Sequence, residues 1–145
     1  MKVSQFTDYA LRVLIHVGSR PGERVSIAAV TDAYGVSRNH LNKVVRRLQE
    51  GGYLLTFRGR GGGVELALPA DQLRIGVLVE DLENLQLVEC FRADSRCPLT
   101  SRCILQTALE QARRAFLDAL NRYTLADLLL HGSTLGPSLT ASPRR

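Results

Sequence analysis

The sequence lacks any long apolar run. Its longer uninterrupted apolar segments, such as Ile75–Val79, are far shorter than the roughly 18 residues that a membrane-spanning helix requires. Near the N-terminus, Asp8 and Arg12 interrupt the stretch where a secretion signal would need a continuous apolar segment. We therefore expect a soluble, cytoplasmic protein with no membrane partner.

Cysteines and enzyme motifs are also scarce. The chain has three cysteines, an odd number that cannot all pair within one chain, and the cytosol disfavours disulfides. The sequence shows no P-loop, no complete dinucleotide fingerprint, no metalloprotease motif and no nucleophile elbow. We therefore expect that the protein is not an enzyme. A redox enzyme or electron carrier is an alternative class, but it would leave the basic segment described next unexplained.

The positive charge is concentrated in one short segment. The chain has 145 residues and a formal net charge of +5, and its length suits one domain with an appended element. Residues 35–63 hold six basic side chains and one acidic side chain, so this segment accounts for the entire net charge. Such a concentration predicts a binding surface for a polyanion.

Helical spacing of apolar residues predicts three helices in the first third of the chain. They cover residues 7–17, 27–34 and 38–50. Ser4 and Ser37 are placed as N-caps, and Gly35 can adopt the left-handed conformation that ends the second helix. Because the second and third helices are joined by a tight turn and the third carries cations, the pair has the helix-turn-helix pattern.

A glycine-rich basic hairpin follows the third helix. Strand-like runs at Tyr53–Phe57 and Val64–Leu68 flank the segment Arg58–Gly63, and this arrangement predicts a hairpin with a basic tip. The glycines lack the Lys-Ser/Thr ending of a P-loop, which argues against an ATP site. The sequence therefore predicts a mostly helical fold with a winged helix-turn-helix.

The third helix and the wing hold the candidate DNA-binding residues. A helix fits the major groove of B-DNA, where its N-terminal side chains read base edges and more distal cations neutralise phosphates. The predicted base contacts come from Ser37, Arg38, Asn39 and His40, the phosphate contacts from Lys43 and from Arg46 or Arg47, and the minor-groove contacts from Arg58 and Arg60. The alternative is a solvated cationic helix face, and the adjoining wing favours DNA.

A long amphipathic helix is predicted near the C-terminus. A helical pattern covers residues 73–82, a polar loop residues 89–102, and a long helix residues 104–123. The apolar stripe of this long helix consists of Leu105, Ala108, Leu109, Ala112, Phe116, Ala119 and Leu120. Because the stripe exceeds what one small winged domain can cover, we expect part of it to contact a partner chain.

Three cysteines gather in the polar loop. Cys90, Cys97 and Cys103 lie outside helical stripes, whereas inert cysteines are usually small buried hydrophobes within regular elements, so this placement favours metal ligation. Structural zinc would want four ligands in close pairs, and the histidines are distant in the sequence. The open spacing suits an iron–sulfur cluster whose fourth ligand comes from elsewhere. Zinc and redox-active thiols are the alternatives.

Several segments together resemble one family of regulators. The segments are Phe6–Arg12, Tyr34–Leu41, Arg58–Gly63, and Leu87–Cys90 with the two later cysteines. They resemble the family of cluster-binding regulators that includes IscR, and within it the nitric-oxide-sensing repressors of the NsrR type, over about residues 1–130. The resemblance implies a homodimer crossed through the long helix, bound to palindromic operator DNA. It also implies repression that is lost when nitric oxide attacks an iron–sulfur cluster held by Cys90, Cys97 and Cys103.

The fourth ligand separates the members of this family. IscR-type proteins use a histidine three residues after the last cysteine, and Gln106 stands there in this chain. NsrR-type proteins can take an aspartate near the N-terminus of the opposite subunit, and Asp8 matches that position. The resemblance therefore implies Asp8 as a ligand to a [4Fe–4S] or [2Fe–2S] cluster. The other interpretation of Asp8 is a carboxylate favoured by the helix dipole.

The predicted organisation has three parts. Residues 1–69 form the winged helix-turn-helix DNA-binding domain, residues 70–130 the cluster-binding loop and the dimerisation helix, and residues 131–145 a disordered tail. The function that follows is a transcriptional repressor that senses nitric oxide. The alternatives are an iron-status or cluster-biogenesis regulator of the same fold and a zinc-stabilised DNA-binding module.

Overall fold

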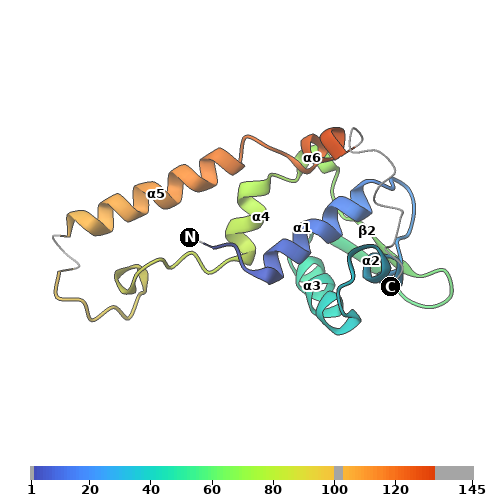
Figure 1. Ribbon diagram of the computed structural model, residues 1–145, viewed down its shortest axis with the longest axis horizontal. Helices are drawn as coiled ribbons and strands as arrows, with labels where there is room; N and C mark the ends of the chain where they lie inside the picture. The colour runs from blue at the N-terminus through green and yellow to red at the C-terminus, as the bar shows by residue number, and fades with distance from the viewer. Residues whose placement is uncertain (1, 100–102, 133–145) are drawn as a thin grey trace.

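The computed structural model describes residues 2–99 and 103–132. In chain order its elements are α1 (Gln5–Gly18), α2 (Ile27–Tyr34), α3 (Arg38–Glu50), strands β1 (Leu54–Phe57) and β2 (Gly63–Leu66), the 3-10 turn η1 (Ala70–Gln72), α4 (Ile75–Leu82), the 3-10 turn η2 (Glu89–Phe91), α5 (Ile104–Leu120) and α6 (Leu125–Gly132). Figure 1 shows that α1 to α4, the hairpin and α6 form one body, from which α5 and the loop before it extend. In the described residues no helix is long and apolar enough to cross a membrane.

Serine caps begin the first three helices. Ser4, Ser26 and Ser37 each accept a hydrogen bond from the backbone N–H three residues further on, at 3.2, 3.1 and 3.3 Å. These bonds satisfy N–H groups that a helix leaves without partners at its start. The helix α2 ends at Gly35, whose φ of 64° lies in the left-handed region, so the predicted turn is confirmed.

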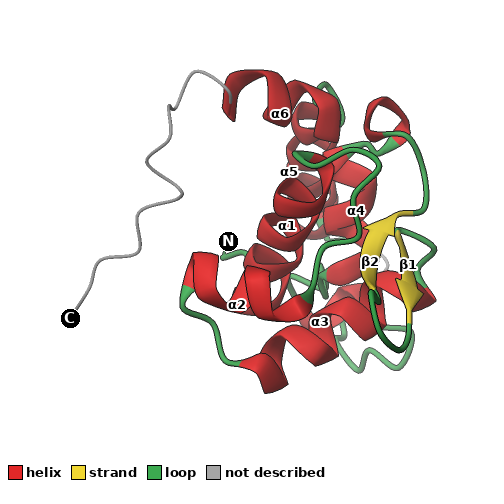
Figure 2. Cartoon of the chain, turned by 90° about the vertical axis from the view of Figure 1, so that its right-hand side faces the viewer, coloured by secondary structure: helices red, strands yellow, loops and turns green. Residues whose placement is uncertain are grey.

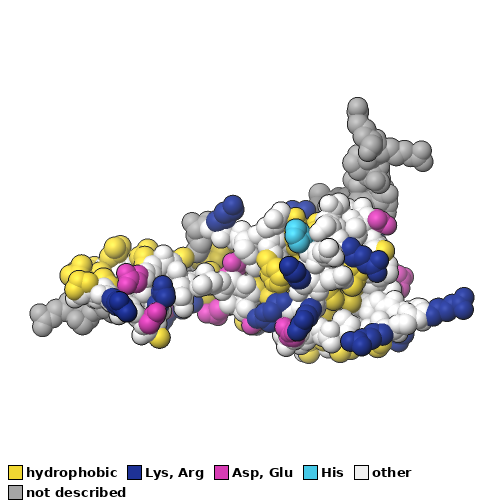
Figure 3. Space-filling model, turned by 90° about the horizontal axis from the view of Figure 1, so that it is seen from below, with side chains coloured by type: hydrophobic (Ala, Val, Ile, Leu, Met, Phe, Trp, Pro, Cys, Tyr) yellow, Lys and Arg dark blue, Asp and Glu magenta, His cyan; other side chains and the backbone are white. Residues whose placement is uncertain are grey.

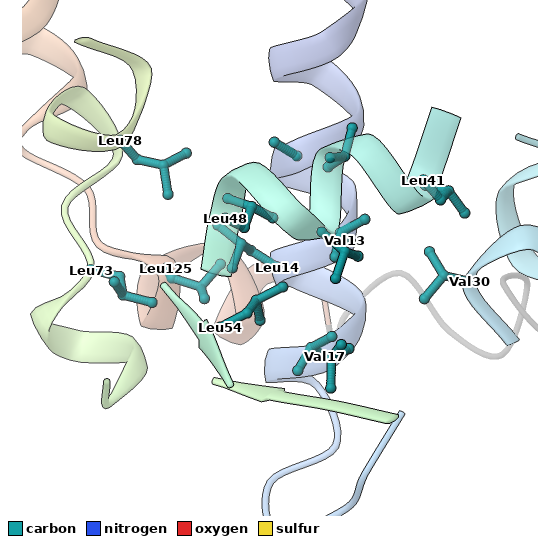
Figure 4. Close-up of a cluster of buried hydrophobic side chains, with 14 of the residues drawn as sticks. Val13, Leu14, Val17, Val30, Leu41, Leu48, Leu54, Leu73, Leu78 and Leu125 are labelled. Atoms are coloured by element: carbon teal, nitrogen blue, oxygen red, sulfur yellow. The ribbon is translucent and has the colours of Figure 1, made fainter. Parts of the chain in front are cut away.

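One hydrophobic core joins the helix-turn-helix to the elements beyond the hairpin. Leu14 of α1, Leu48 of α3, Leu54 of β1, Leu78 of α4 and Leu125 of α6 are each at most 1% exposed, and Figure 4 shows them in one cluster. The central helix α1 contacts α3, α4, α6 and β2. Burial of such leucines contributes about 1.5–3 kcal/mol each, so this shared core fixes the position of α3.

The hairpin is tied to the chain before α2. Strands β1 and β2 pair antiparallel, with Leu54 opposite Leu66 and Phe57 opposite Gly63. Val25 adds a short antiparallel bridge to Val64, through Val25 N–H to Val64 O at 3.0 Å and the reverse bond at 2.8 Å. The wing therefore has backbone contact with the segment that leads into the helix-turn-helix, and Figure 2 shows the hairpin next to α3.

The contact between α4 and the end of α5 is close. A Cβ atom on Gly76 would lie 2.5 Å from Asn121 Oδ1 and 2.5 Å from the carbonyl oxygen of Leu117. Asn121 Oδ1 also accepts a hydrogen bond of 2.9 Å from the backbone N–H of Val77, in the first turn of α4. Because Gly76 has no side chain, the two helices approach closely, and this contact fixes the C-terminal end of α5 to the body.

The structure corrects several predicted boundaries. The fourth helix begins at Ile75 rather than residue 73, α5 ends at Leu120 rather than 123, and both strands are shorter than predicted. The helix α6 was not predicted, and it runs to Gly132, so the predicted tail does not begin at 131. A capping box marks its start, since Thr124 and Asp127 exchange hydrogen bonds. Residues 100–102 and 133–145 of the predicted loop and tail lie outside the described residues.

Candidate nucleic-acid interface and metal centre

The outer face of α3 carries the predicted base-contacting residues. Its inner face is buried through Leu41, Val44, Val45 and Leu48. On the opposite side, the side chains at the start of the helix are exposed: Ser37, Arg38, Asn39, His40 and Lys43. Because the inner face is anchored in the core, the outer face can enter a groove as a rigid unit. That these residues touch DNA stays a prediction.

The cations of α3 fall into two groups. In the part of the chain that the structure describes, no acidic side chain pairs with Arg38 or Lys43. Arg46 pairs with Glu50 at 2.9 Å and remains 81% exposed. Arg47 points back to α4 and donates to both the carboxylate and the carbonyl of Asp81, each at 2.8 Å. Of the two arginines considered for a phosphate contact, Arg46 is therefore the available one.

The wing presents two further free arginines. Arg58 and Arg60 are exposed at its tip, and no acid among residues 2–99 and 103–130 pairs with either. The turn requires glycine, because Gly59 and Gly61 have φ values of 86° and 75° that other residues rarely adopt. Figure 3, which views the molecule from the side of α3, shows Lys and Arg side chains spread over this face of the body.

The three cysteines lie on the segment between α4 and α5. Cys90 is in η2, Cys97 is in the following loop and Cys103 is the N-cap of α5. Each is half-buried and none forms a disulfide, and none belongs to the hydrophobic core. Gln106 Nε2 donates to the carbonyl oxygen of Cys90 at 3.2 Å, beside a groove of about 760 Å³ between this segment and α5.

The donor chemistry of the three cysteines suits an iron–sulfur cluster, although the structure does not bring these candidate ligands together among the residues that it describes. Cysteines close together in sequence, with no disulfide and no place in the core, are the ligands that such clusters use. Among the described residues, no three metal-ligating side chains are close enough to hold an ion. Asp8 lies in the first turn of α1 and pairs with Arg12 at 2.9 Å. A complete ligand set therefore requires movement of the loop, a second chain, or both.

Two carboxylates at the end of α4 connect the cysteine segment to α1 and α3. Asp81 binds Arg47 of α3. Glu83 Oε1 accepts a hydrogen bond of 2.6 Å from the backbone N–H of Ser4. Burial alone would raise the pKa of Glu83, but hydrogen bonds from Thr7 and Ser4 together lower that pKa below its ordinary value. Neither carboxylate was predicted from the sequence, because their partners are far away along the chain.

A charge cluster on α5 faces the same groove. Arg113 pairs with Glu110 at 2.9 Å and with Glu80 of α4 at 3.0 Å, and Arg114 pairs with Glu110 at 2.8 Å. Hydrogen bonds from Arg113 and then Arg114 lower the pKa of Glu110 from 4.5 to about 2. The cluster links α5 to α4 and keeps Glu110 ionised at acidic pH values, well below its ordinary pKa of 4.5.

Comparison with known proteins settles the family. A model of the Rrf2 family, described as an iron-dependent transcriptional regulator, matches residues 3–131. The chain belongs to the Rrf2 family. The prediction of a transcriptional regulator with a winged-helix DNA-binding fold is thereby confirmed.

Solved structures share the Rrf2 fold over nearly the full chain. CymR of B. subtilis, described as its global cysteine regulator, is 23% identical, with a TM-score of 0.70 over 90% of this chain and 98% of CymR. The oxidized form of Staphylococcus aureus CymR is 25% identical, with a TM-score of 0.69 over 89% of this chain and 96% of that chain. IscR of T. potens is 21% identical, with a TM-score of 0.75 over 94% of this chain and 91% of that chain. Neither the Rrf2 match nor these structures single out the NsrR type.

Proposed function

We propose that this Rrf2 protein is a homodimeric repressor that binds a palindromic operator and loses it when nitric oxide is present. The observation that carries the proposal is the set of three half-buried cysteines on one segment, Cys90, Cys97 and Cys103, none of which forms a disulfide. That segment is joined through α4 to the candidate DNA-binding helix. The candidate sensing segment and the candidate DNA-binding helix are thus connected through α4 within one chain.

Operator binding uses α3 and the wing. The exposed start of α3 enters the major groove, where Arg38 reads a base edge, and Lys43 and Arg46 neutralise phosphates. Arg58 and Arg60 of the wing lie over the adjacent minor groove. Two copies of this unit bind half-sites about 34–36 Å apart, or a multiple of that distance.

The second copy covers α5. Ile104 is 85% exposed and Leu105 is 63% exposed, although both are large apolar residues. Of the residues in α5, Leu117 alone is fully buried, so most of the apolar stripe has no partner within the described chain. Since large exposed apolar patches mark interaction sites, the helix supplies the dimer interface.

Cys90, Cys97 and Cys103 would hold the cluster, and Asp8 from the partner subunit would supply a carboxylate as the fourth ligand. Because the described residues of one chain contain no group of three candidate ligands close enough to hold an ion, a second copy is a suitable source of the missing ligand. A bound iron–sulfur cluster would supply iron that is reactive towards nitric oxide, and a weakly held fourth ligand would leave that iron accessible. A carboxylate suits that role because iron in such clusters prefers thiolate ligands.

The end of α4 couples the conformation of the cysteine segment to the positions of α1 and α3. Asp81 holds Arg47 of α3, and Glu83 holds the first turn of α1 through Ser4. The cysteine segment follows directly after Glu83. A rearrangement of that segment therefore acts on α1 and α3 through these two carboxylates.

Anaerobic purification tests the proposal. We expect iron and acid-labile sulfide in the wild-type protein, their loss in the variant Cys97→Ser, and enrichment of a palindromic duplex from a randomised pool by the wild-type protein. Bound zinc without iron would refute the cluster and favour the zinc-stabilised module. Failure to enrich any duplex would refute operator binding.

The family description favours one alternative function. Because the matching model describes iron-dependent regulators, an iron-status or cluster-biogenesis repressor of the same architecture is the second candidate. Such a protein would release its operator after an iron chelator removes the metal, and nitric oxide would not accelerate the release. The proposed repressor responds to nitric oxide while iron is still plentiful.

A further inference from the structure

Arg24 contacts both strands of the wing. Its guanidinium lies 4.0 Å from the ring centroid of Phe57, the last residue of β1. Its Nε also donates to Glu65 Oε1 in β2 at 3.1 Å. Arg24 lies two residues before the N-cap of α2, so one side chain connects the wing to the start of the helix-turn-helix.

The backbone beside Arg24 leaves the wing little freedom. Val25 and Val64 exchange two hydrogen bonds. A Cβ atom on Gly63 would lie only 2.7 Å from the carbonyl oxygen of Val25, so the two backbones are already in close contact. The contact of Arg24 with Phe57 extends this connection from the Val25–Val64 bridge to the end of β1.

The wing needs such support because it is small. Each strand has four residues, and an isolated two-stranded hairpin is at best marginally stable in water. Arg58 directly follows Phe57, so whatever fixes the Phe57 ring also fixes where the basic tip begins. The contacts with Phe57 and Glu65 hold the guanidinium of Arg24 against the wing itself.

We propose that Arg24 is a positioning residue for DNA binding. It acts through Phe57 and Glu65 to hold Arg58 and Arg60 at the distance from α3 that one duplex requires. This assignment rests on the proposed function, since it concerns how the same protein engages its operator.

A double-mutant cycle on DNA tests the assignment. The probe is a labelled duplex selected by the wild-type protein from a randomised pool. We expect Arg24→Ala to lower affinity about fivefold, from the loss of one cation–π contact and one exposed ion pair. The same change should have almost no effect when Arg58 and Arg60 are both alanine. Equal losses in both backgrounds would overturn the proposal, since a direct phosphate contact or a general loss of stability would act in either.

The control is Arg20→Ala. Arg20 carries the same charge on the same connecting segment, but it donates to the carbonyl oxygen of His16. We expect this variant to bind within about twofold of wild type, because the structure shows Arg20 bonded to the end of α1 and shows the contacts with Phe57 and Glu65 for Arg24 instead. A fivefold loss here would show that any charge on this segment matters and would overturn the specific role of Arg24.

Wing order in the free protein provides a second readout, which does not depend on DNA. The backbone ¹⁵N heteronuclear NOE of residues 58–62 should fall in Arg24→Ala and stay unchanged in Arg20→Ala. An unchanged NOE would overturn the proposal. If no duplex is ever selected, operator binding has failed, and the NOE of the wing alone decides whether Arg24 positions it.

Discussion

The basic side chains of α3 differ in whether an acidic side chain already pairs with them. Arg38 and Lys43 have no acidic partner among the residues that the structure describes, whereas Arg47 is held by Asp81. Arg46 lies between these cases, since its pair with Glu50 is highly exposed. Exposed pairs of this kind contribute about 0–1 kcal/mol, so a phosphate can replace Glu50 at little cost.

Arg38→Ala should weaken binding to the selected duplex by about 1–3 kcal/mol, because Arg38 stands where a base contact is expected. Lys43→Ala should weaken binding to selected and random duplexes by about the same factor. It should also reduce the slope of log affinity against log salt concentration by about one. Fluorescence anisotropy at several salt concentrations measures both effects. Arg122→Ala, an exposed arginine after α5, is the control. If Arg38→Ala weakens selected and random duplexes equally, Arg38 does not read sequence.

Glu110 should titrate with a pKa of about 2. Since this pKa is lowered on folding, the ionised carboxylate stabilises the protein above pH 4.5, and that contribution is lost as the pH falls from 4.5 towards 2. A ¹³C NMR titration of the carboxyl group measures the value directly. Arg114→Ala, which removes one of its partners, should raise it. A wild-type pKa near 4.5 would show that the two arginines do not bind Glu110 in solution.

The sequence predicted local side-chain roles better than distant ones. The capping bonds of Ser4 and Ser37 connect residues three apart, and such local chemistry follows from residue type and position. The pair between Arg47 and Asp81 connects residues 34 apart. Nothing in the sequence assigned Arg47 to α4 rather than to a phosphate, because that choice depends on how two helices pack.

At the level of secondary-structure elements, the helix-turn-helix and the hairpin were predicted from the sequence and α6 was not. The helices α2 and α3 have periodic apolar patterns, each with a serine N-cap and a glycine C-cap. The sequence of α6 is short and almost uniformly apolar, so its pattern does not distinguish helix from strand. The box formed by Thr124 and Asp127 is the signal that would have found it.

Gly76→Ala should destabilise the protein by about 1–3 kcal/mol, because the added methyl group would contact the carbonyl of Leu117 and the side chain of Asn121. This destabilisation is at least as large as the gain of up to about 1 kcal/mol that replacing glycine with alanine brings to a helix. Urea unfolding measures the change, with Val77→Ala at the exposed neighbouring position as control. A stabilised variant would show that α4 and α5 are not in close contact.

At the scale of the whole molecule, the sequence predicts an exposed apolar surface better than it predicts a site that depends on contacts between two chains. The unpartnered faces of α5 were predictable from its apolar stripe, since Leu105 and its neighbours exceed what one small domain can bury. The proposed assembly of the cysteines with a fourth ligand was not derivable from spacing. Such a site depends on loop conformation and on the placement of a second subunit, and neither is encoded in local periodicity.

Leu105→Glu should convert the dimer to a monomer. An unpaired charge in a buried interface costs about 3 kcal/mol or more, which raises the dissociation constant at least about a hundredfold. Sedimentation velocity at several concentrations measures the effect. Leu130→Glu is the matched control, because Leu130 is 70% exposed on α6 rather than on α5. A dimeric Leu105→Glu variant would place the interface elsewhere.

Operator affinity during a nitric oxide titration of the anaerobic wild-type protein tests the link between the cysteine segment and DNA. Visible absorbance recorded on the same sample reports whether the metal centre has reacted. We predict that affinity falls by about 10- to 100-fold, the usual range for coupling between two sites, in step with the absorbance change. Full affinity after the absorbance change is complete would contradict nitric oxide sensing by this protein.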